Sequence, residues 1–166
     1  MIQVSENQVA SLMEKAAVGA GYDQGTGQWL AVVVTMALKA GRPGLSYARR
    51  ALAAAPEPAQ VQETAEGWRC SSKVSLVAGP ILTDFIMASL PIAPPELDVP
   101  ETWQTLMEGP QLNTQAPFHV EAEDWAFCEA LAHKTYVPAT DENRLSGAGA
   151  GVNDVCLLYT SDAADD

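Results

Sequence analysis

The chain has 166 residues, of which 48% are hydrophobic and 18% charged, and its formal net charge is −12 at pH 7. This composition excludes a wholly disordered chain, and the length is enough for one globular domain that buries most of its apolar surface. The negative charge argues against nucleic acid and anionic membrane as partners, because phosphate binding needs a concentrated positive patch. Three cysteines without metal-type spacing exclude a disulfide scaffold and a zinc finger.

The start of the chain carries no secretory signal, since it has neither a basic region nor an apolar core of the required kind. The longest apolar stretch, Trp29–Leu38, is interrupted only by Thr35. It is too short to span a bilayer, so we expect a buried helix there. Together with the unpaired thiols, these features predict a cytoplasmic protein.

Residues 5–19 carry the clearest helix signals. Ser5 and Gln8 have the spacing of a capping box. An apolar face follows at helical spacing, formed by Val9, Leu12, Met13, Ala16 and Ala17. We expect these five side chains to be buried, and we expect Gly19 and Gly21 to end the helix.

Two further helices are expected in the first third of the chain. The second runs from about Thr26 to Ala40 and is apolar around its whole axis, which is typical of a helix at the centre of a core. The third, over residues 46–55, is rich in alanine and turns Arg49 and Arg50 toward water.

The middle of the chain combines short apolar runs with several prolines. Residues 73–78 alternate imperfectly and could form a strand. Pro80 then opens an expected apolar helix as its first residue. The prolines between positions 91 and 100 indicate a stiff linker that cannot join the centre of a sheet. After the linker we expect a short helix near Trp103–Met107 and a strand near Phe118–Val120.

A last helix is expected from about Ala122 to His133, with acids in its first turn, where they stabilise the positive end of the helix dipole. Its expected buried stripe consists of Trp125, Cys128, Leu131 and Ala132. We therefore predict an α+β fold: a single, mostly helical domain with a small sheet in the middle. In this fold the three N-terminal helices pack against the Trp125 helix.

The end of the chain differs from the rest. We expect a globular domain over residues 1–146, followed by a flexible Gly/Ala-rich segment over residues 147–155. Residues 156–166 resemble the conceptual translation of a transposase-type sequencing adapter. We expect them to be read-through from a metagenomic library and not part of the natural protein. The alternative is a natural apolar tail that docks on the domain.

Two stretches, Val4–Gly21 and Leu131–Gly151, resemble an uncharacterised bacterial family, domain of unknown function 3726. The second stretch, which ends in Gly-Ala-Gly-Ala-Gly, is the more specific. The resemblance implies a small cytoplasmic protein that ends shortly after the Gly/Ala run, and it implies no reaction. Members of that family carry carboxylates near the start of the second helix, where this chain has Gly27 and Gln28, so no role for acids is expected there.

One segment holds the densest cluster of groups capable of acid–base chemistry: His133, Tyr136, Asp141, Glu142 and Arg144. A histidine titrates near neutral pH, and a tyrosine can donate a proton to a developing oxyanion. The acids and the arginine could orient the histidine or hold a carboxylate substrate. The alternative is structural: His133 ends a helix, where a cation favours the dipole, and Tyr136 packs beside a proline turn.

Three weaker patterns also carry chemistry. His119, Glu121 and Glu123 would share one face of a strand and could hold a divalent metal, although solvated acids at a helix start explain them better. Gly147–Gly151 has neither the preceding strand nor the following helix that a phosphate loop needs. Cys128 lies on an apolar stripe, where a thiol behaves as a small hydrophobe, and it is poorly aligned with the histidine five residues on.

The sequence assembles neither a nucleophile–base pair nor a metal-ligand pattern. We therefore predict a small acidic accessory protein of the cytoplasm that binds a protein partner or a small metabolite, and neither nucleic acid nor membrane. The sequence indicates no particular cofactor and no metal. The alternative is a small enzyme or enzyme subunit that uses the segment from His133 to Arg144.

Overall fold

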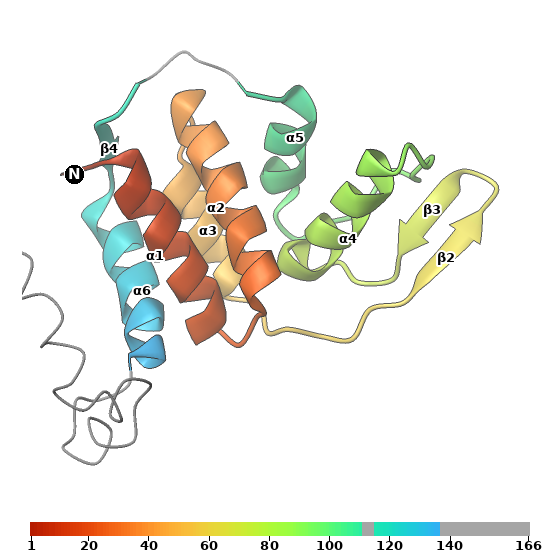
Figure 1. The fold of residues 1–166 in the computed structure, drawn as a ribbon, viewed down its shortest axis with the longest axis horizontal. Coiled ribbons are helices and arrows are strands. Elements are labelled where there is room, and N and C mark those ends of the chain that lie inside the picture. Colours follow the sequence, from red (N-terminus) through yellow and green to blue (C-terminus); the bar gives the residue numbers. More distant parts are fainter. Residues whose placement is uncertain (111–114, 137–166) are drawn as a thin grey trace, which may run out of the picture. The chain divides into compact units, whose positions relative to one another are not determined.

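A computed structural model describes residues 1–110 and 115–136 (Figure 1). Within these residues the fold is α+β and mostly helical, as predicted, with six α-helices and two antiparallel sheets of two strands each. The helices are α1 (Glu6–Gly19), α2 (Gln24–Lys39), α3 (Gly44–Leu52), α4 (Ser75–Met87), α5 (Pro100–Glu108) and α6 (Ala122–Ala132). The strands are β1 (Ile2–Val4), β2 (Val61–Thr64), β3 (Gly67–Cys70) and β4 (Phe118–Val120). The expected boundaries at residues 146 and 155 lie outside the described residues.

Helix α1 follows its prediction residue by residue. Ser5 Oγ accepts a hydrogen bond from the backbone N–H of Gln8 (3.2 Å), and the backbone N–H of Ser5 donates to Gln8 Oε1 (2.7 Å). These two bonds complete the capping box. All five side chains of the predicted apolar face are buried. The helix therefore presents one apolar side to the core.

Helix α2 is the centre of the core, since it contacts α1, α3, α4 and α5. It begins two residues earlier than predicted because Asp23 caps it, accepting the backbone N–H of Thr26 (2.8 Å). Packing against α1 is so close that a Cβ atom on Gly27 would lie 2.9 Å from the carbonyl oxygen of Glu14. A carboxylate side chain at position 27 would not fit there. Of the helices in the described ranges, none is long and apolar enough to cross a membrane.

Helix α6 lies against α1 and α3, two of the three N-terminal helices that were expected to pack on it (Figure 1). Cys128 and Ala132 are buried at this contact, while Trp125 and Leu131 are half-buried. The two arginines of α3 pair with acids on neighbouring helices: Arg49 Nη1 with Glu123 Oε1 (2.7 Å) and Arg50 Nη1 with Glu101 Oε1 (2.8 Å). Helix α3 itself lies slightly N-terminal to its predicted span.

The small sheet at the start of the chain joins β1 to β4 in antiparallel register. Val4 lies opposite Phe118, and Gln3 lies opposite His119. The short helix α5 and the strand β4 occur at their predicted places. The pairing holds the first residues of the chain beside the start of α6.

The expected strand at residues 73–78 is wrong. Ser75 begins α4 instead, and its backbone N–H donates to Asp98 Oδ1 (2.8 Å). Asp98 lies far along the chain from this helix start, so local sequence patterns gave no sign of the cap. Pro80 consequently lies inside α4 and not at its first position, where its missing N–H leaves one helical hydrogen bond unmade.

The sheet of the middle region is the hairpin β2–β3. Thr64 lies opposite Gly67, whose φ of 119° suits glycine, and Thr64 Oγ1 donates to Gly67 O (2.6 Å). The proline linker runs along the other edge of β3: Trp68 N–H donates to Pro91 O (2.8 Å), and Ala93 N–H donates to Trp68 O (2.9 Å). The linker thus stays at the edge of the sheet, as its prolines predict.

Candidate functional site

The predicted acid–base segment is only partly within the described residues. His133 begins the short 3-10 turn His133–Thr135 at the end of α6, and its side chain is exposed. Tyr136 is also exposed, at 57%. The remaining candidates, Asp141, Glu142 and Arg144, lie outside the described residues, as does the Gly147–Gly151 run. A role for this segment stays a prediction.

The three predicted metal-ligand candidates are divided between two elements. His119 lies in β4, Glu121 is the N-cap of α6, and Glu123 is in the first turn of that helix. Within residues 1–110 and 115–136, no group of three His, Cys, Asp or Glu side chains could hold a metal ion. Glu121 and Glu123 thus stand at the start of α6.

His119 and Glu121 line a hollow of about 240 Å³ that also includes Arg42 and Asp124. Arg42 forms an ion pair with Glu108, and Asp124 Oδ1 pairs with Arg49 Nη1 (3.2 Å). The charges of Arg42 and Asp124 in this hollow are therefore each paired with an opposite charge of another residue.

The thiol of Cys128 is fully buried in the core. Burial, with the negative charge of Asp124 as a second cause, raises its pKa to about 12. A thiol of this kind is neutral at physiological pH and is a poor nucleophile. Cys128 is accordingly a core residue.

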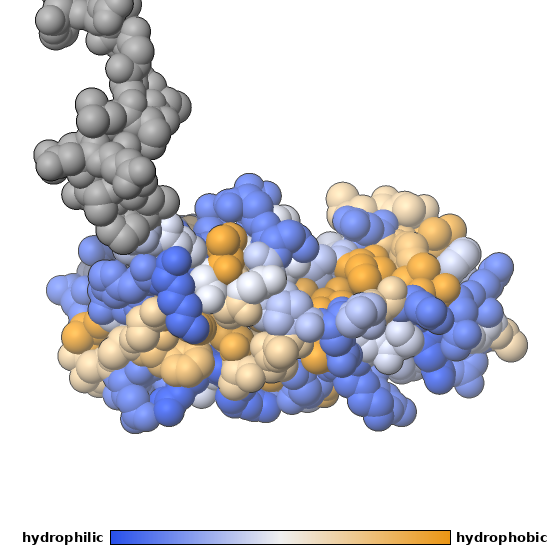
Figure 2. Space-filling view, turned by 90° about the horizontal axis from the view of Figure 1, so that it is seen from below, coloured by the Kyte–Doolittle hydropathy of each residue, from blue (hydrophilic) through white to orange (hydrophobic). Residues whose placement is uncertain are grey.

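A larger groove lies between the first turns of α2, helix α4 and the loop that follows α3. Its volume is about 620 Å³, and we call it the α2–α4 groove. Its apolar wall is formed by Trp29, Leu76, Val77, Pro80 and Ile81. The face seen in Figure 2 has apolar surface in its right-hand part, where α4 and the β2–β3 hairpin lie, and also farther left, with hydrophilic side chains between.

Three carboxylates also line the α2–α4 groove: Asp23, Glu57 and Asp84. The hydrogen bond from the backbone of Thr26 lowers the pKa of the Asp23 carboxyl. Glu57 Oε1 accepts a hydrogen bond from Ser72 Oγ (2.6 Å). Among the described residues, no Lys or Arg lines the groove, and none of the three carboxylates has an ion-pair partner.

Six cationic side chains of the described residues pair with acids that do not line the groove. These ion pairs are Lys39–Glu6, Arg42–Glu108, Arg49–Glu123, Arg50–Glu101, Arg69–Glu66 and Lys73–Glu96. The lining of the groove itself is therefore negatively charged. The phenol of Tyr22 lies in this environment: its pKa is raised to about 12, first by burial and then by the charges of Asp98 and Glu57.

The indole of Trp29 is fixed by a chain of two hydrogen bonds. Its Nε1–H donates to Thr83 Oγ1 (2.9 Å), and that hydroxyl donates to Gly79 O (2.7 Å). The ring packs against Gly79, where any side chain would overlap it. Because its polar N–H is satisfied within the protein, the part of the ring that faces the groove is apolar.

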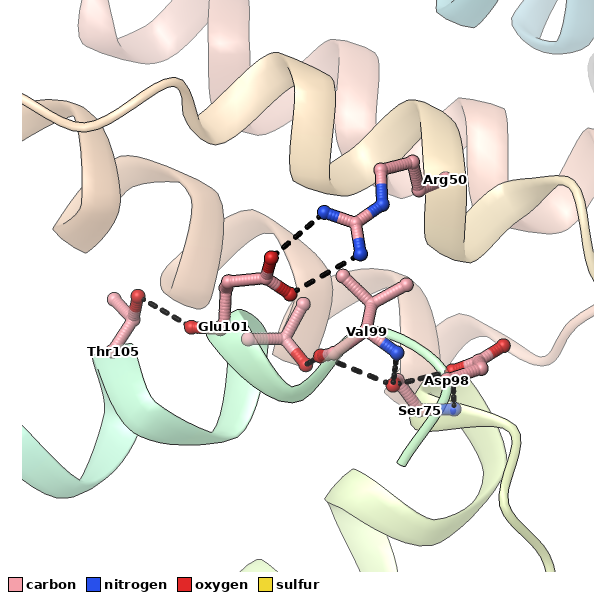
Figure 3. Close-up of polar contacts among 7 residues, drawn as sticks. Arg50, Ser75, Asp98, Val99, Glu101 and Thr105 are labelled. Carbon is pink, nitrogen blue, oxygen red and sulfur yellow. Dashed lines mark hydrogen bonds and ion pairs between the residues drawn. The ribbon is translucent and has the colours of Figure 1, made fainter. Parts of the chain in front are cut away.

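Polar contacts outside the groove hold its α4 wall (Figure 3). Ser75 Oγ donates to Asp98 Oδ1 (2.6 Å) and accepts the backbone N–H of Val99 (3.0 Å). Glu101, in the first turn of α5, forms a two-bond ion pair with Arg50 of α3 (2.8 and 3.3 Å), which lowers the pKa of the Glu101 carboxyl. These contacts link α4 to the start of α5 and link α5 to α3. They therefore fix the position of α4, which forms one wall of the groove.

Sequence reasoning missed the groove because its lining comes from three separate segments, around residues 21–29, 56–57 and 76–84. One signal was available in the sequence. The stretch from Leu76 to Ile86 has more apolar residues than one buried helix face needs, and Val77 and Ile81 are only half-buried.

Comparison with known proteins gives no further assignment. The chain matches no protein family, no curated protein and no solved structure. The resemblance of Val4–Gly21 and Leu131–Gly151 to an uncharacterised family stays a prediction.

Proposed function

We propose that the protein is a non-catalytic accessory protein that binds a small organic molecule in the α2–α4 groove. The observation that carries the proposal is the groove itself, with its volume of about 620 Å³, its apolar wall and its three carboxylates. Small-molecule sites have volumes of about 300–1,000 Å³ and a lining of this kind. A stable protein partner needs roughly 800 Å² of surface on each side. The groove therefore favours a metabolite over a protein partner.

Catalysis has less support from the same groove. Among the described residues its lining contains no histidine and no cysteine, and the neutral thiol of Cys128 is buried in the core. The alternative of an enzyme that uses the segment from His133 to Arg144 remains a second prediction.

A thermal-unfolding screen of the 166-residue chain against a metabolite library tests the proposal. A ligand at about 100 times its Kd adds roughly 2.7 kcal/mol to the free energy of unfolding, which raises Tm by several degrees. Each hit is then tested on Val77→Trp, which fills the groove. The matched control is Val32→Trp, because Val32 is 54% exposed on α2 and does not line the groove.

Support would consist of a ligand that stabilises the wild type and Val32→Trp but fails to stabilise Val77→Trp. Equal stabilisation of all three proteins would mean that the ligand binds elsewhere and would contradict the proposal. A screen without any hit would contradict it too. Circular dichroism checks that Val77→Trp is folded, and Ile81→Trp is the second groove-filling variant if it is not.

A further inference from the structure

The lining of the α2–α4 groove also indicates the chemical class of the ligand. We infer that the ligand is a small organic cation, an inference that rests on the proposed function. The ligand is an amine whose apolar body lies on the wall formed by Trp29, Val77 and Ile81. Its ammonium group faces the carboxylates of Asp23, Glu57 and Asp84.

The side-chain hydrogen-bond donors of the groove are all used within the protein. Four lining side chains carry an O–H or N–H group, and each donates within the protein. Tyr22 donates to Ala54 O (2.9 Å), Thr26 to Asp23 Oδ2 (3.2 Å), Trp29 to Thr83 Oγ1 (2.9 Å) and Thr83 to Gly79 O (2.7 Å). A carboxylate or phosphate ligand would find no side-chain donor there. The lining side chains therefore offer an anion no free donor.

Carboxylate oxygens in the groove, in contrast, remain available as hydrogen-bond acceptors. An ionised carboxylate accepts about four hydrogen bonds. Glu57 uses one oxygen toward Ser72, and the side chain of Asp84 has no hydrogen-bond or ion-pair partner among the described residues. An ammonium group supplies donors and positive charge together, which is what these acceptors lack.

The size and shape of the groove also suit such a ligand. Its volume is about 620 Å³, and the half-buried Val77 and Ile81 lie in its lining together with Trp29, whose side chain is 9% exposed. A flat or branched apolar group can pack on the exposed parts of these side chains. A ligand that combines one apolar group with one ammonium group matches both parts of the lining.

Isothermal titration calorimetry on the 166-residue chain tests the inference with three probes of similar shape. These are phenethylammonium chloride, the neutral phenethyl alcohol and the anionic hydrocinnamate. The variant Asp84→Asn removes one groove charge while disturbing no described contact. Its matched control is Glu129→Gln, because Glu129 is exposed on α6, away from the groove.

We expect phenethylammonium to bind about fivefold more tightly than the alcohol and hydrocinnamate to bind most weakly. Asp84→Asn should weaken binding of the amine about two- to fivefold, Glu129→Gln should leave it unchanged, and added salt should weaken it. The inference is overturned if the alcohol or the anion binds as tightly as the amine, or if Asp84→Asn has no effect. It is also overturned if the amine does not bind at millimolar concentration.

The variant Val77→Trp separates this failure from failure of the proposed function. If the alcohol or the anion binds as well as the amine and Val77→Trp abolishes that binding, the groove is a ligand site and only the cation class is wrong. If Val77→Trp leaves the binding of every probe unchanged, both the class and the site are wrong.

Discussion

The indole ring of Trp29 packs directly on Gly79, and no Cβ atom fits between α2 and α4 at this point. Gly79→Ala would push the two helices apart. We expect the free energy of unfolding to fall by about 1–3 kcal/mol, the usual cost of overpacking a core. The higher helix propensity of alanine would by itself raise the free energy of unfolding by about 1 kcal/mol. Urea denaturation therefore shows directly which effect dominates.

The same substitution in a Trp29→Leu background is the control for this prediction. A smaller ring-free side chain leaves room for the added methyl group, so Gly79→Ala should cost less there. An equal cost in both backgrounds would show that Trp29 is not the group with which the methyl collides.

Removal of the Ser75 hydroxyl should destabilise the protein more than its size suggests. Ser75→Ala leaves the buried backbone N–H of Val99 without its acceptor and takes one donor from Asp98. We expect a loss of about 1–3 kcal/mol in urea denaturation, the cost of a buried polar group left unsatisfied. Ser11→Ala is the control, since Ser11 is exposed on α1 and its replacement should change stability by less than about 0.5 kcal/mol. Similar effects of the two variants would refute this reading of the contacts in Figure 3.

Stability should decline at alkaline pH through Tyr22. The pKa of its phenol is raised from 10.0 to about 12 in the folded protein. Between these values the unfolded chain loses the proton while the folded protein keeps it. The contribution of Tyr22 to the free energy of unfolding is therefore complete below pH 10 and is lost as the pH rises toward 12.

Tyr22→Phe should remove this part of the alkaline decline. It should also cost about 1 kcal/mol at neutral pH, because the hydrogen bond from Tyr22 to Ala54 O is lost. Urea denaturation at a series of pH values measures both effects, with Tyr47→Phe as the control that keeps Tyr22. The prediction is wrong if the stability of Tyr22→Phe declines with rising pH as steeply as that of Tyr47→Phe.

The capping box of α1 offers a prediction that depends on local contacts alone. Ser5→Ala removes the acceptor for the backbone N–H of Gln8 and should lower the free energy of unfolding by about 1 kcal/mol. Ser5→Asp keeps a side-chain acceptor at the N-cap and should retain most of the stability. Thermal unfolding of both variants checks the prediction, and an equal loss in both would contradict it.

The elements that the sequence predicts well are those whose signals are local. The capping box and apolar spacing of α1 lie within the helix itself, and the buried face was predicted residue by residue. The start of α6 and the strand β4 are marked by adjacent residues in the same way. Propensity and periodicity are enough to predict a helix or strand whose signals all lie within its own residues.

The start of α4 and the groove depend on residues that are distant in the sequence. The backbone N–H of Ser75, at the start of α4, donates to the side chain of Asp98 in the loop that follows the helix. The alternation of residues 73–78 indicates a strand because it contains no sign of this distant contact. The groove likewise forms only when segments near Asp23, Glu57 and Asp84 meet. Periodicity describes one element at a time, and it carries no information about which elements become neighbours.

The antiparallel pairing of Val4 with Phe118 has a consequence for synthesis of the chain. Strand β1 leaves the ribosome before its partner β4, which follows only after α1 to α5 have emerged. Until then, the side of α1 that α6 covers stays open to solvent, and an exposed apolar surface on a nascent chain invites association. A ribosome stalled before residue 118 would therefore hold a chain whose first helices can pack locally but whose first strand has no partner.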